Sequence, residues 1–208
     1  MRYLHRDHPR QLYAVPYRVV RARACVGLEP LAVGYSSPVL SRDGGTLYIG
    51  SADFKLHAIH AKNGSAVWEF AAEGRIDTSP TLSPDGATLY FGAWDGHLYA
   101  ICAATGAQKW SFDAGAKIDQ SSPALSRDGA TVYFGTCQGN GSVFAVETAA
   151  GTARWGAASG APIYSSPRLS ADGATLYIGS SSNRTLALET ATGHLRWSHE
   201  SGCEGVPL

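Results

Sequence analysis

The sequence predicts an all-β protein built of β-propeller-type repeats, and three observations support this fold class. A Ser/Thr-Ser-Pro tripeptide recurs four times, with its prolines 42, 43 and 44 positions apart. Each copy is followed by the same order of short apolar and aromatic segments, separated by turns that contain glycine. No segment has a helical period. Self-similarity at about 40–50 residues with four strands in each unit is the signature of propeller blades. The repeated prolines are Pro38, Pro80, Pro123 and Pro167.

The second unit shows why its first two strands are expected. Thr81-Leu82 is a short apolar segment. Ser83-Pro84-Asp85-Gly86 predicts a turn, because Pro fixes φ, Asp bonds its own backbone and Gly accepts a positive φ. Thr88-Leu89-Tyr90-Phe91 is rich in β-branched and aromatic residues, which favours a strand.

The second half of the unit predicts two further strands. Asp95-Gly96 is a hairpin signal, and Leu98-Tyr99-Ala100-Ile101 follows it as the third strand. After the turn at Thr105-Gly106, the segment Gln108–Phe112 alternates as the fourth strand.

Spacing inside the units is stricter than the overall period. The alanine of the third strand and the tryptophan of the fourth are always 10 positions apart. Additional residues occur instead in a hairpin loop, at Gln138–Gly141, where insertions are tolerated. The four pairs are Ala58 and Trp68, Ala100 and Trp110, Ala145 and Trp155, and Ala187 and Trp197.

These units resemble the repeat of the quinoprotein-like (pyrroloquinoline-quinone repeat) β-propeller family. The pattern A-x-x-x-x-T-G-x-x-x-W carries the resemblance, which covers residues 31–208. It implies that each repeated tryptophan packs between neighbouring blades, against a turn that contains glycine, and that the family's rings close with seven or eight blades. It implies a fold rather than one activity, since the same repeat serves in dehydrogenases, assembly scaffolds and sensor domains.

We expect a basic segment at 1–30, followed by a repeat domain at 31–208. The first 30 residues hold six Arg and two acids. This composition suits a transit peptide except for its lack of Ser, whereas the similarity of Gln11–Val15 to His97–Ile101 indicates a partial N-terminal blade. The blades are expected at about 36–77, 78–120, 121–164 and 165–208.

Four blades and a remnant leave open edges, for which three outcomes stay open. In descending order of preference, they are a fragment of a larger ring, an open arc completed by another copy, and a compact four-bladed ring. Exposed strand edges favour self-association in the second case.

Composition excludes some classes of function. The formal net charge is zero and no basic stripe runs through the repeats, which argues against nucleic-acid binding. No run of 18 apolar residues is present, so no membrane span is predicted. The N-terminus lacks the apolar core of a secretory signal. The sequence assigns no compartment.

A binding site, if present, is expected where the segments that join the units vary. These segments share a buried Ile or Val, but their flanking residues differ between units, as a site requires. A basic residue stands two positions before an acidic one in two of them, and such a pair could hold a polar ligand; a solvated rim ion pair is the simpler interpretation. The candidate residues are Arg75, Asp77, Lys117, Asp119, Gln120 and Tyr164.

Several repeated or isolated residues have a structural interpretation. The strict period of the four tryptophans favours packing over ligand binding. Trp94 has no counterpart in the other units and is either a contact point or an ordinary rim residue. Asp43, Asp85, Asp128 and Asp172 stand singly beside Gly, without calcium-ligand spacing, and are interpreted as turn residues. The N-x-S/T patterns at Asn63, Asn140 and Asn183 lie in predicted hairpin loops, where Asn favours turns.

Catalysis has little support in the sequence. Quinone-dependent alcohol dehydrogenases of the resembled family carry a vicinal Cys-Cys disulfide, an Asp base and calcium ligands. The four cysteines of this chain are scattered, without a Cys-Cys or C-x-x-C pair. We therefore expect a non-catalytic scaffold or sensor that binds a protein or a small ligand. The alternative is a fragment of a pyrroloquinoline-quinone-dependent dehydrogenase, with the quinone and calcium implied by resemblance alone.

Overall fold

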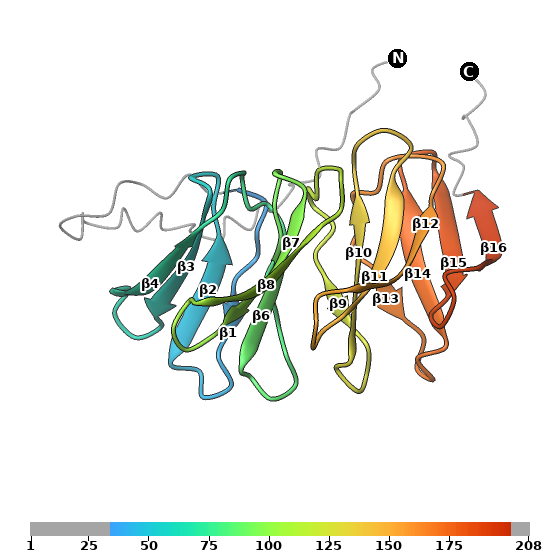
Figure 1. Cartoon of the computed structure of the whole chain (residues 1–208). Coiled ribbons are helices and arrows are strands. Elements are labelled where there is room, and N and C mark those ends of the chain that lie inside the picture. The colour runs from blue at the N-terminus through green and yellow to red at the C-terminus, as the bar shows by residue number, and fades with distance from the viewer. Residues whose placement is uncertain (1–33, 201–208) are drawn as a thin grey trace, which may run out of the picture. The chain divides into compact units, whose positions relative to one another are not determined.

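The computed structural model describes residues 34–200, and its regular elements in this range are all β-strands. They form four antiparallel sheets of four strands, each strand paired with the next in the chain (Figure 1). The expected partial N-terminal blade lies outside the described residues. The strands are β1 (Val39–Leu40), β2 (Thr46–Gly50), β3 (Lys55–His60), β4 (Ala66–Ala71), β5 (Thr81–Leu82), β6 (Thr88–Gly92), β7 (His97–Cys102), β8 (Gln108–Asp113), β9 (Ala124–Leu125), β10 (Thr131–Thr136), β11 (Ser142–Glu147), β12 (Ala153–Ala158), β13 (Arg168–Leu169), β14 (Thr175–Ser180), β15 (Arg184–Glu189) and β16 (Leu195–Glu200).

The predicted strands of the second unit are confirmed to within one residue at each end by β5, β6, β7 and β8. The constant spacing of alanine and tryptophan also has a structural reason. Ala100 lies opposite Trp110 in the register of β7 and β8, and the other three pairs are matched in the same way. A register shift follows each alanine, so a loop of another length would misplace the tryptophan.

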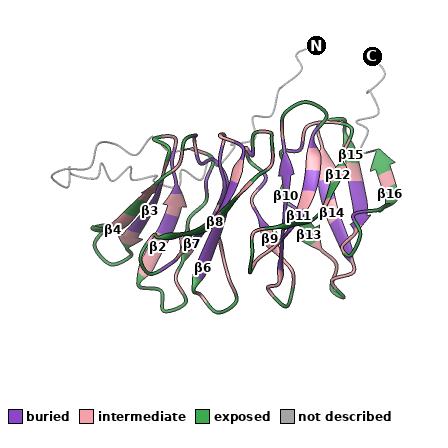
Figure 2. Ribbon diagram, in the orientation of Figure 1, coloured by how far each residue is buried: buried purple, intermediate pink, exposed green. Residues whose placement is uncertain are grey.

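The core lies between successive sheets rather than within one. Between the first and second sheets, Phe70 of β4 meets Phe91 and Tyr99, with ring centroids 5.7 and 5.2 Å apart. Two further apolar clusters of the same kind join the second sheet to the third and the third to the fourth. The middle strands are accordingly buried, while β4 and β8 are largely exposed (Figure 2).

The repeated tryptophans pack between neighbouring sheets, as the resemblance implied. Trp68 donates a hydrogen bond of 3.1 Å from Nε1 to the carbonyl of Ala103 in the next sheet. Its ring lies over Gly106, where an added Cβ would stand 2.7 Å from Trp68 Cε3. Trp110 and Trp155 make the corresponding hydrogen bonds and meet the corresponding glycines, so the tryptophans are structural.

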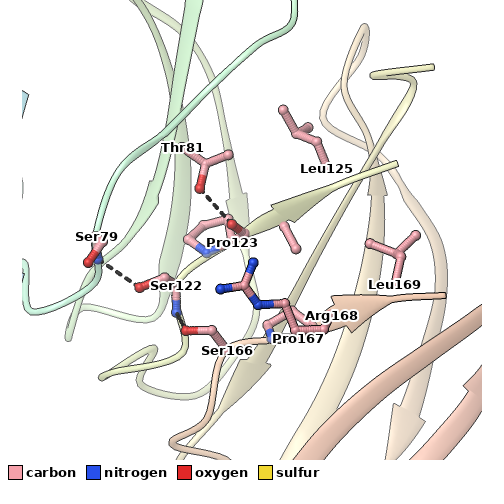
Figure 3. Close-up of a pocket in the computed structure, with 10 residues that line it drawn as sticks. Ser79, Thr81, Ser122, Pro123, Leu125, Ser166, Pro167, Arg168 and Leu169 are labelled. Carbon is pink, nitrogen blue, oxygen red and sulfur yellow. Dashed lines mark hydrogen bonds between the residues drawn. The ribbon is translucent and has the colours of Figure 1, made fainter. Parts of the chain in front are cut away.

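The second residue of each Ser/Thr-Ser-Pro tripeptide lies just before the first strand of its sheet and links it to the next sheet (Figure 3). Ser37 N–H donates to Ser79 Oγ, Ser79 N–H to Ser122 Oγ, and Ser122 N–H to Ser166 Oγ, at 2.8, 2.8 and 3.0 Å. We call this chain of bonds the serine ladder. The first residue serves its own sheet: the Ser121 hydroxyl, for example, accepts from Gly135 N–H at 2.9 Å.

The four sheets form an open arrangement. The described residues show no strand pairing and no shared core between the first and last sheets. Trp197 of β16, in the packing position of the other three tryptophans, is 48% exposed. The compact four-bladed ring is therefore wrong for this part of the chain, because a closed ring would cover Trp197.

Candidate functional site

The two ends of each sheet carry different kinds of connection. Because the strands are antiparallel, the first and third connections of a sheet lie at one end, which we call the turn end. The second connection and the segment leading to the next sheet lie at the opposite end, which we call the loop end. Function is best sought where the repeat varies.

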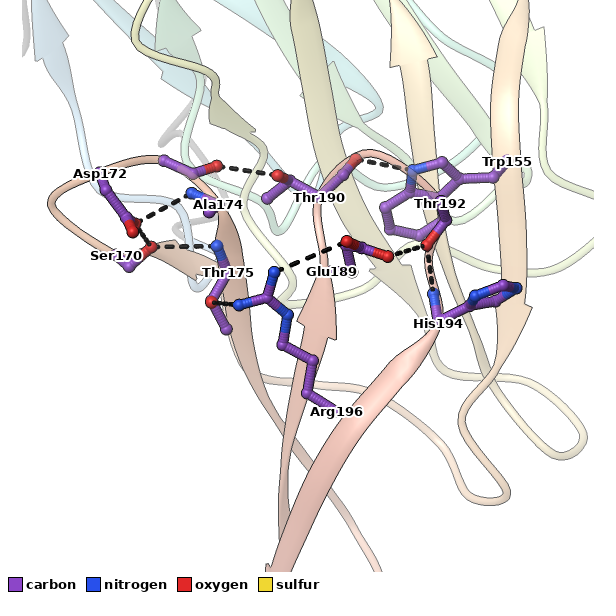
Figure 4. Close-up of polar contacts among 11 residues, drawn as sticks. Trp155, Ser170, Asp172, Ala174, Thr175, Glu189, Thr190, Thr192, His194 and Arg196 are labelled. Atoms are coloured by element: carbon purple, nitrogen blue, oxygen red, sulfur yellow. Dashed lines mark hydrogen bonds and ion pairs between the residues drawn. The ribbon is translucent and has the colours of Figure 1, made fainter.

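The turn end repeats the same polar contacts four times. In the last sheet, Asp172 Oδ1 accepts from Ser170 Oγ at 2.5 Å and from Ala174 N–H at 3.0 Å (Figure 4). These hydrogen bonds lower the pKa of the Asp172 carboxyl from 3.8, the Ser170 bond most. Asp43, Asp85 and Asp128 make the same contacts. Their interpretation as turn residues is confirmed.

At the loop end, each joining segment is fixed to the two sheets that it connects. Ile118 N–H donates to the carbonyl of Ala93 in the second sheet, at 3.2 Å. The preceding residue, Lys117, accepts from Cys137 N–H of the third sheet, at 2.9 Å. The Ile118 side chain is fully buried against Gly92, where an added Cβ would stand 2.2 Å from Ile118 Cγ2. The shared isoleucine is thus core, as predicted, and it anchors the residues that flank it.

Trp94 is the centre of a polar and aromatic cluster at this end. The Arg75 guanidinium carbon lies 4.7 Å and Lys117 Nζ 4.9 Å from the centroid of its ring, both within cation–π range. Trp94 Nε1 donates to Asp119 Oδ1 at 3.1 Å. Two joining segments and one hairpin therefore converge on a single indole. We call Arg75, Trp94, Lys117 and Asp119 the Trp94 cluster.

An ion pair with the buried Asp77 fixes the Arg75 guanidinium. Its Nη2 lies 3.3 Å from Asp77 Oδ2, and the Asp77 side chain is fully buried. Trp94 N–H also donates to the Arg75 carbonyl at 2.9 Å, which fastens the hairpin to the joining segment. A guanidinium fixed by a buried carboxylate loses little further freedom on binding a ligand.

Asp119 of the cluster and the neighbouring Cys137 both have raised pKa values. Burial raises the pKa of the Asp119 carboxyl, against the opposing effect of the Trp94 hydrogen bond. Burial also raises the pKa of the Cys137 thiol, and the negative charge of Asp119 adds to this rise. A reactive cysteine needs a lowered pKa, because the thiolate is the nucleophile. The arrangement fits binding better than covalent catalysis.

A hollow of about 280 Å³ opens beside the cluster, lined by Trp94, Lys117, Asp119, Cys137, Gln138 and Tyr164. A larger hollow of about 510 Å³ lies along the first strands of the second, third and fourth sheets (Figure 3). Half of the residues that line it are repeated serines and prolines, and the Ser122 and Ser166 hydroxyls there accept ladder bonds. The smaller hollow is the better candidate because the residues around it are those that break the repeat.

The structure brings together four of the six residues predicted from sequence. Arg75, Lys117 and Asp119 meet at Trp94, and Tyr164 lines the same hollow, 43% exposed. Asp77 lies beneath Arg75 as its buried support. Gln120 is exposed and does not line the hollow.

Two sequence-based interpretations need correction. A solvated rim pair is wrong for Arg75 and Asp77, because Asp77 is buried. Lys117 and Asp119 contact Trp94 instead of forming an ion pair with each other. Of the two interpretations of Trp94, an ordinary rim residue is the wrong one, since three side chains contact its ring. Its isolation in the repeat was the available signal, but sequence could not show that two joining segments converge on it.

The calcium implied by resemblance does not fit the described residues. Calcium takes six to eight oxygen ligands, several of them carboxylates. Among residues 34–200, no three or more His, Cys, Asp or Glu side chains gather as metal ligands would. Of the two carboxylates near Trp94, Asp77 is occupied by Arg75 and Asp119 by the indole N–H.

Comparison with known proteins identifies the family. A family profile described as outer membrane protein assembly factor BamB matches residues 21–200. The chain belongs to this family. Among solved structures, BamB from Moraxella catarrhalis is similar in fold, with a TM-score of 0.65 and 21% sequence identity. The match covers 81% of this chain and 50% of that one, so the chain spans about half the length of that protein. A search of curated proteins gave no match.

The family and the structural match confirm the expected quinoprotein-like repeat fold, and they are consistent with a binding role. Among residues 34–200, no helix has the length and apolar character needed to cross a membrane.

Proposed function

We propose that this chain is a non-catalytic scaffold module that binds a partner protein through its loop end, centred on Trp94. The observation that carries the proposal is the Trp94 cluster, in which a tryptophan, an arginine and a lysine converge beside a hollow. Trp, Tyr and Arg are the residues most enriched at the energetic centres of protein interfaces.

The position of the cluster supports a protein partner over a small substrate. The hollow of about 280 Å³ stands at the lower limit of ligand pockets, which span about 300–1,000 Å³ and enclose most of a bound molecule. Tyr164 and Gln138 are exposed at its margin. Lys117, which forms no ion pair among residues 34–200, and the exposed ring of Tyr164 suit a partner segment that presents an acidic side chain beside an apolar one. The family description, an assembly factor, is in keeping with such a role.

Site-directed photo-crosslinking in the source cells tests this proposal. Tyr164 is replaced by the photoreactive p-benzoylphenylalanine at the loop end, and the exposed Arg127 is replaced in the same way at the turn end. We expect a discrete protein adduct from position 164, none from position 127, and loss of the adduct when Trp94→Ala is added. The captured protein, purified, should then bind with its Kd weakened about thirtyfold by Trp94→Ala.

Adducts of equal yield from both ends, or an adduct that Trp94→Ala does not change, would contradict the proposal.

The purified chain is also titrated with pyrroloquinoline quinone plus calcium. Saturable quenching of tryptophan fluorescence that Trp94→Ala abolishes would favour the dehydrogenase alternative. An unchanged spectrum at high micromolar quinone is the expected result.

A further inference from the structure

The contact between neighbouring sheets is built three times in this chain from the same parts. One sheet contributes the tryptophan, and the next contributes the glycine turn that receives it and the carbonyl that accepts its N–H. An interface of this kind is heterologous, because the two surfaces differ and complement each other. The outer face of the last sheet and that of the first can each be compared with one half of this interface.

The outer face of the last sheet presents the tryptophan half. Trp197 is 48% exposed, and Tyr177 lies 5.9 Å from it, as Tyr133 lies 5.9 Å from Trp155 inside the structure. No described residue accepts a hydrogen bond from Trp197 Nε1, whereas Trp155 Nε1 reaches the Thr190 carbonyl at 2.9 Å.

The outer face of the first sheet presents the receiving half. Gly64 occupies the position of Gly106, Gly151 and Gly193, and its positive φ of 73° is close to their values of 72°, 68° and 74°. An added Cβ at Gly64 would have nothing within 4 Å, whereas at the other three positions it would lie within 2.7 Å of a tryptophan ring. Ala61 occupies the position whose backbone carbonyl accepts the indole N–H in the other sheets. The residues there are Ala103, Thr148 and Thr190. The seat for a tryptophan is thus formed but empty among the described residues.

The serine ladder is interrupted at the same two faces. Within the chain, each Ser N–H donates to the hydroxyl of its counterpart in the next sheet. Among residues 34–200, the Ser166 N–H has no such acceptor and the Ser37 hydroxyl has no such donor. These two groups are complementary across a fourth interface.

We propose that a second copy of this chain binds head to tail, with Trp197 of each copy in the Gly64 seat of the other. Two such contacts related by a twofold axis close a ring, and the segment that matches BamB covers 50% of that chain, so two copies of this segment match its length. The proposal concerns the outer faces of the sheets and is independent of the partner-binding loop end.

Charge supports a second copy as the occupant. Where Phe70 meets Tyr99 inside the structure, the corresponding outer positions are His199 on the last sheet and His57 on the first. His57 Nε2 lies 2.9 Å from Asp53 Oδ2 and its Nδ1 3.2 Å from Glu69 Oε1. His57 is buried, and Glu69 also contacts Lys55 Nζ at 2.6 Å, so the exposed His199 of one copy would approach Asp53, the less paired of the two carboxylates, on the other.

Sedimentation equilibrium of the full chain, at tens of micromolar, tests the proposal. The expected mass is twice 21.9 kDa. Gly64→Asn blocks the seat with a side chain that tolerates positive φ and meets open space in the single chain. Gly44→Asn is the matched control, with φ 71° and equally open surroundings at a turn. We expect the mass of one chain for Gly64→Asn and of two for Gly44→Asn, with the same circular dichroism.

Trp197→Ala provides a second variant from the opposite face. It should raise the dimer dissociation constant about thirtyfold, the order expected for truncating a buried interface tryptophan. A mass of one chain for the wild type at every concentration would overturn the proposal. This is the result expected if residues 1–33 cover the Gly64 seat. Assemblies larger than two chains, or a dimer that Gly64→Asn and Trp197→Ala leave intact, would overturn it as well.

Discussion

The turn end and the loop end of the sheets differ in what the repeat keeps constant. At the turn end, the same Ser, Asp and backbone N–H contacts recur in all four sheets. At the loop end, the hairpin position of Trp94 is Ala52, Cys137 or Ser181 in the other sheets. The constant contacts close turns and hold the fold together, while the variable end is free to carry a site on a rigid support.

Electrostatics separates the two ends as well. Hydrogen bonds from serine lower the pKa of the four turn aspartates, whereas burial raises the pKa of Asp119 at the loop end. A carboxylate whose charge is satisfied belongs to the structure. A carboxylate that loses hydration on burial without enough hydrogen bonds to replace it can still be stabilised by a ligand.

The largest effect on stability should come from a repeated tryptophan. Trp110→Ala removes an indole from the contact between the second and third sheets and leaves the Thr148 carbonyl without its donor. We expect the free energy of unfolding to fall by about 3 kcal/mol. Urea unfolding followed by circular dichroism measures it. A loss below about 0.5 kcal/mol, the range of ordinary surface changes, would contradict a structural role for the repeated tryptophans.

A smaller effect is expected from the serine ladder. Ser122→Ala leaves the Ser79 N–H without its acceptor, at a cost of about 1 kcal/mol. Ser37→Ala is the matched control, since the Ser37 hydroxyl accepts no ladder bond among residues 34–200, and it should be neutral at concentrations where the chain is monomeric. Equal losses in both variants, measured by urea unfolding, would show that the ladder bonds contribute nothing specific.

The smallest effect is a difference in titration. The turn aspartates stabilise the fold above their unfolded pKa of 3.8, and this contribution is lost as the pH falls through their lowered values. Asp119 has the opposite sign: its contribution is present below 3.8 and is lost as the pH rises through its raised value. The free energy of unfolding of Asp119→Asn, taken relative to that of wild type, should therefore be higher at pH 7 than at pH 3. Carboxyl NMR titration should place Asp119 above 3.8 and Asp172 below it; the reverse order would contradict the assigned environments.

Sequence alone was sufficient for the parts that repeat. Turn residues, the fixed distance from Ala100 to Trp110 and the buried Ile118 are set by local chemistry and by a period that four copies make visible. The strands of the second unit could therefore be located to within one residue.

The site could be predicted only in outline. Variation pointed to Arg75, Lys117 and Asp119, but their common contact is Trp94, which lies in a different connection. Its place depends on backbone bonds between a joining segment and the hairpins of two sheets, and such long-range contacts have no local sequence signal. For the same reason, the burial of Asp77 beneath Arg75 could not be predicted.

The claim that the loop end binds while the turn end supports the fold is tested most directly by comparing two tryptophans. Trp94→Ala and Trp110→Ala are made in the chain that carries the photoreactive residue at position 164, and urea unfolding and adduct yield are measured for both. The account predicts that Trp94→Ala keeps its free energy of unfolding within about 1 kcal/mol of wild type and loses the adduct. A Trp94→Ala chain destabilised as much as Trp110→Ala, or one that still forms the adduct at wild-type yield, would contradict it.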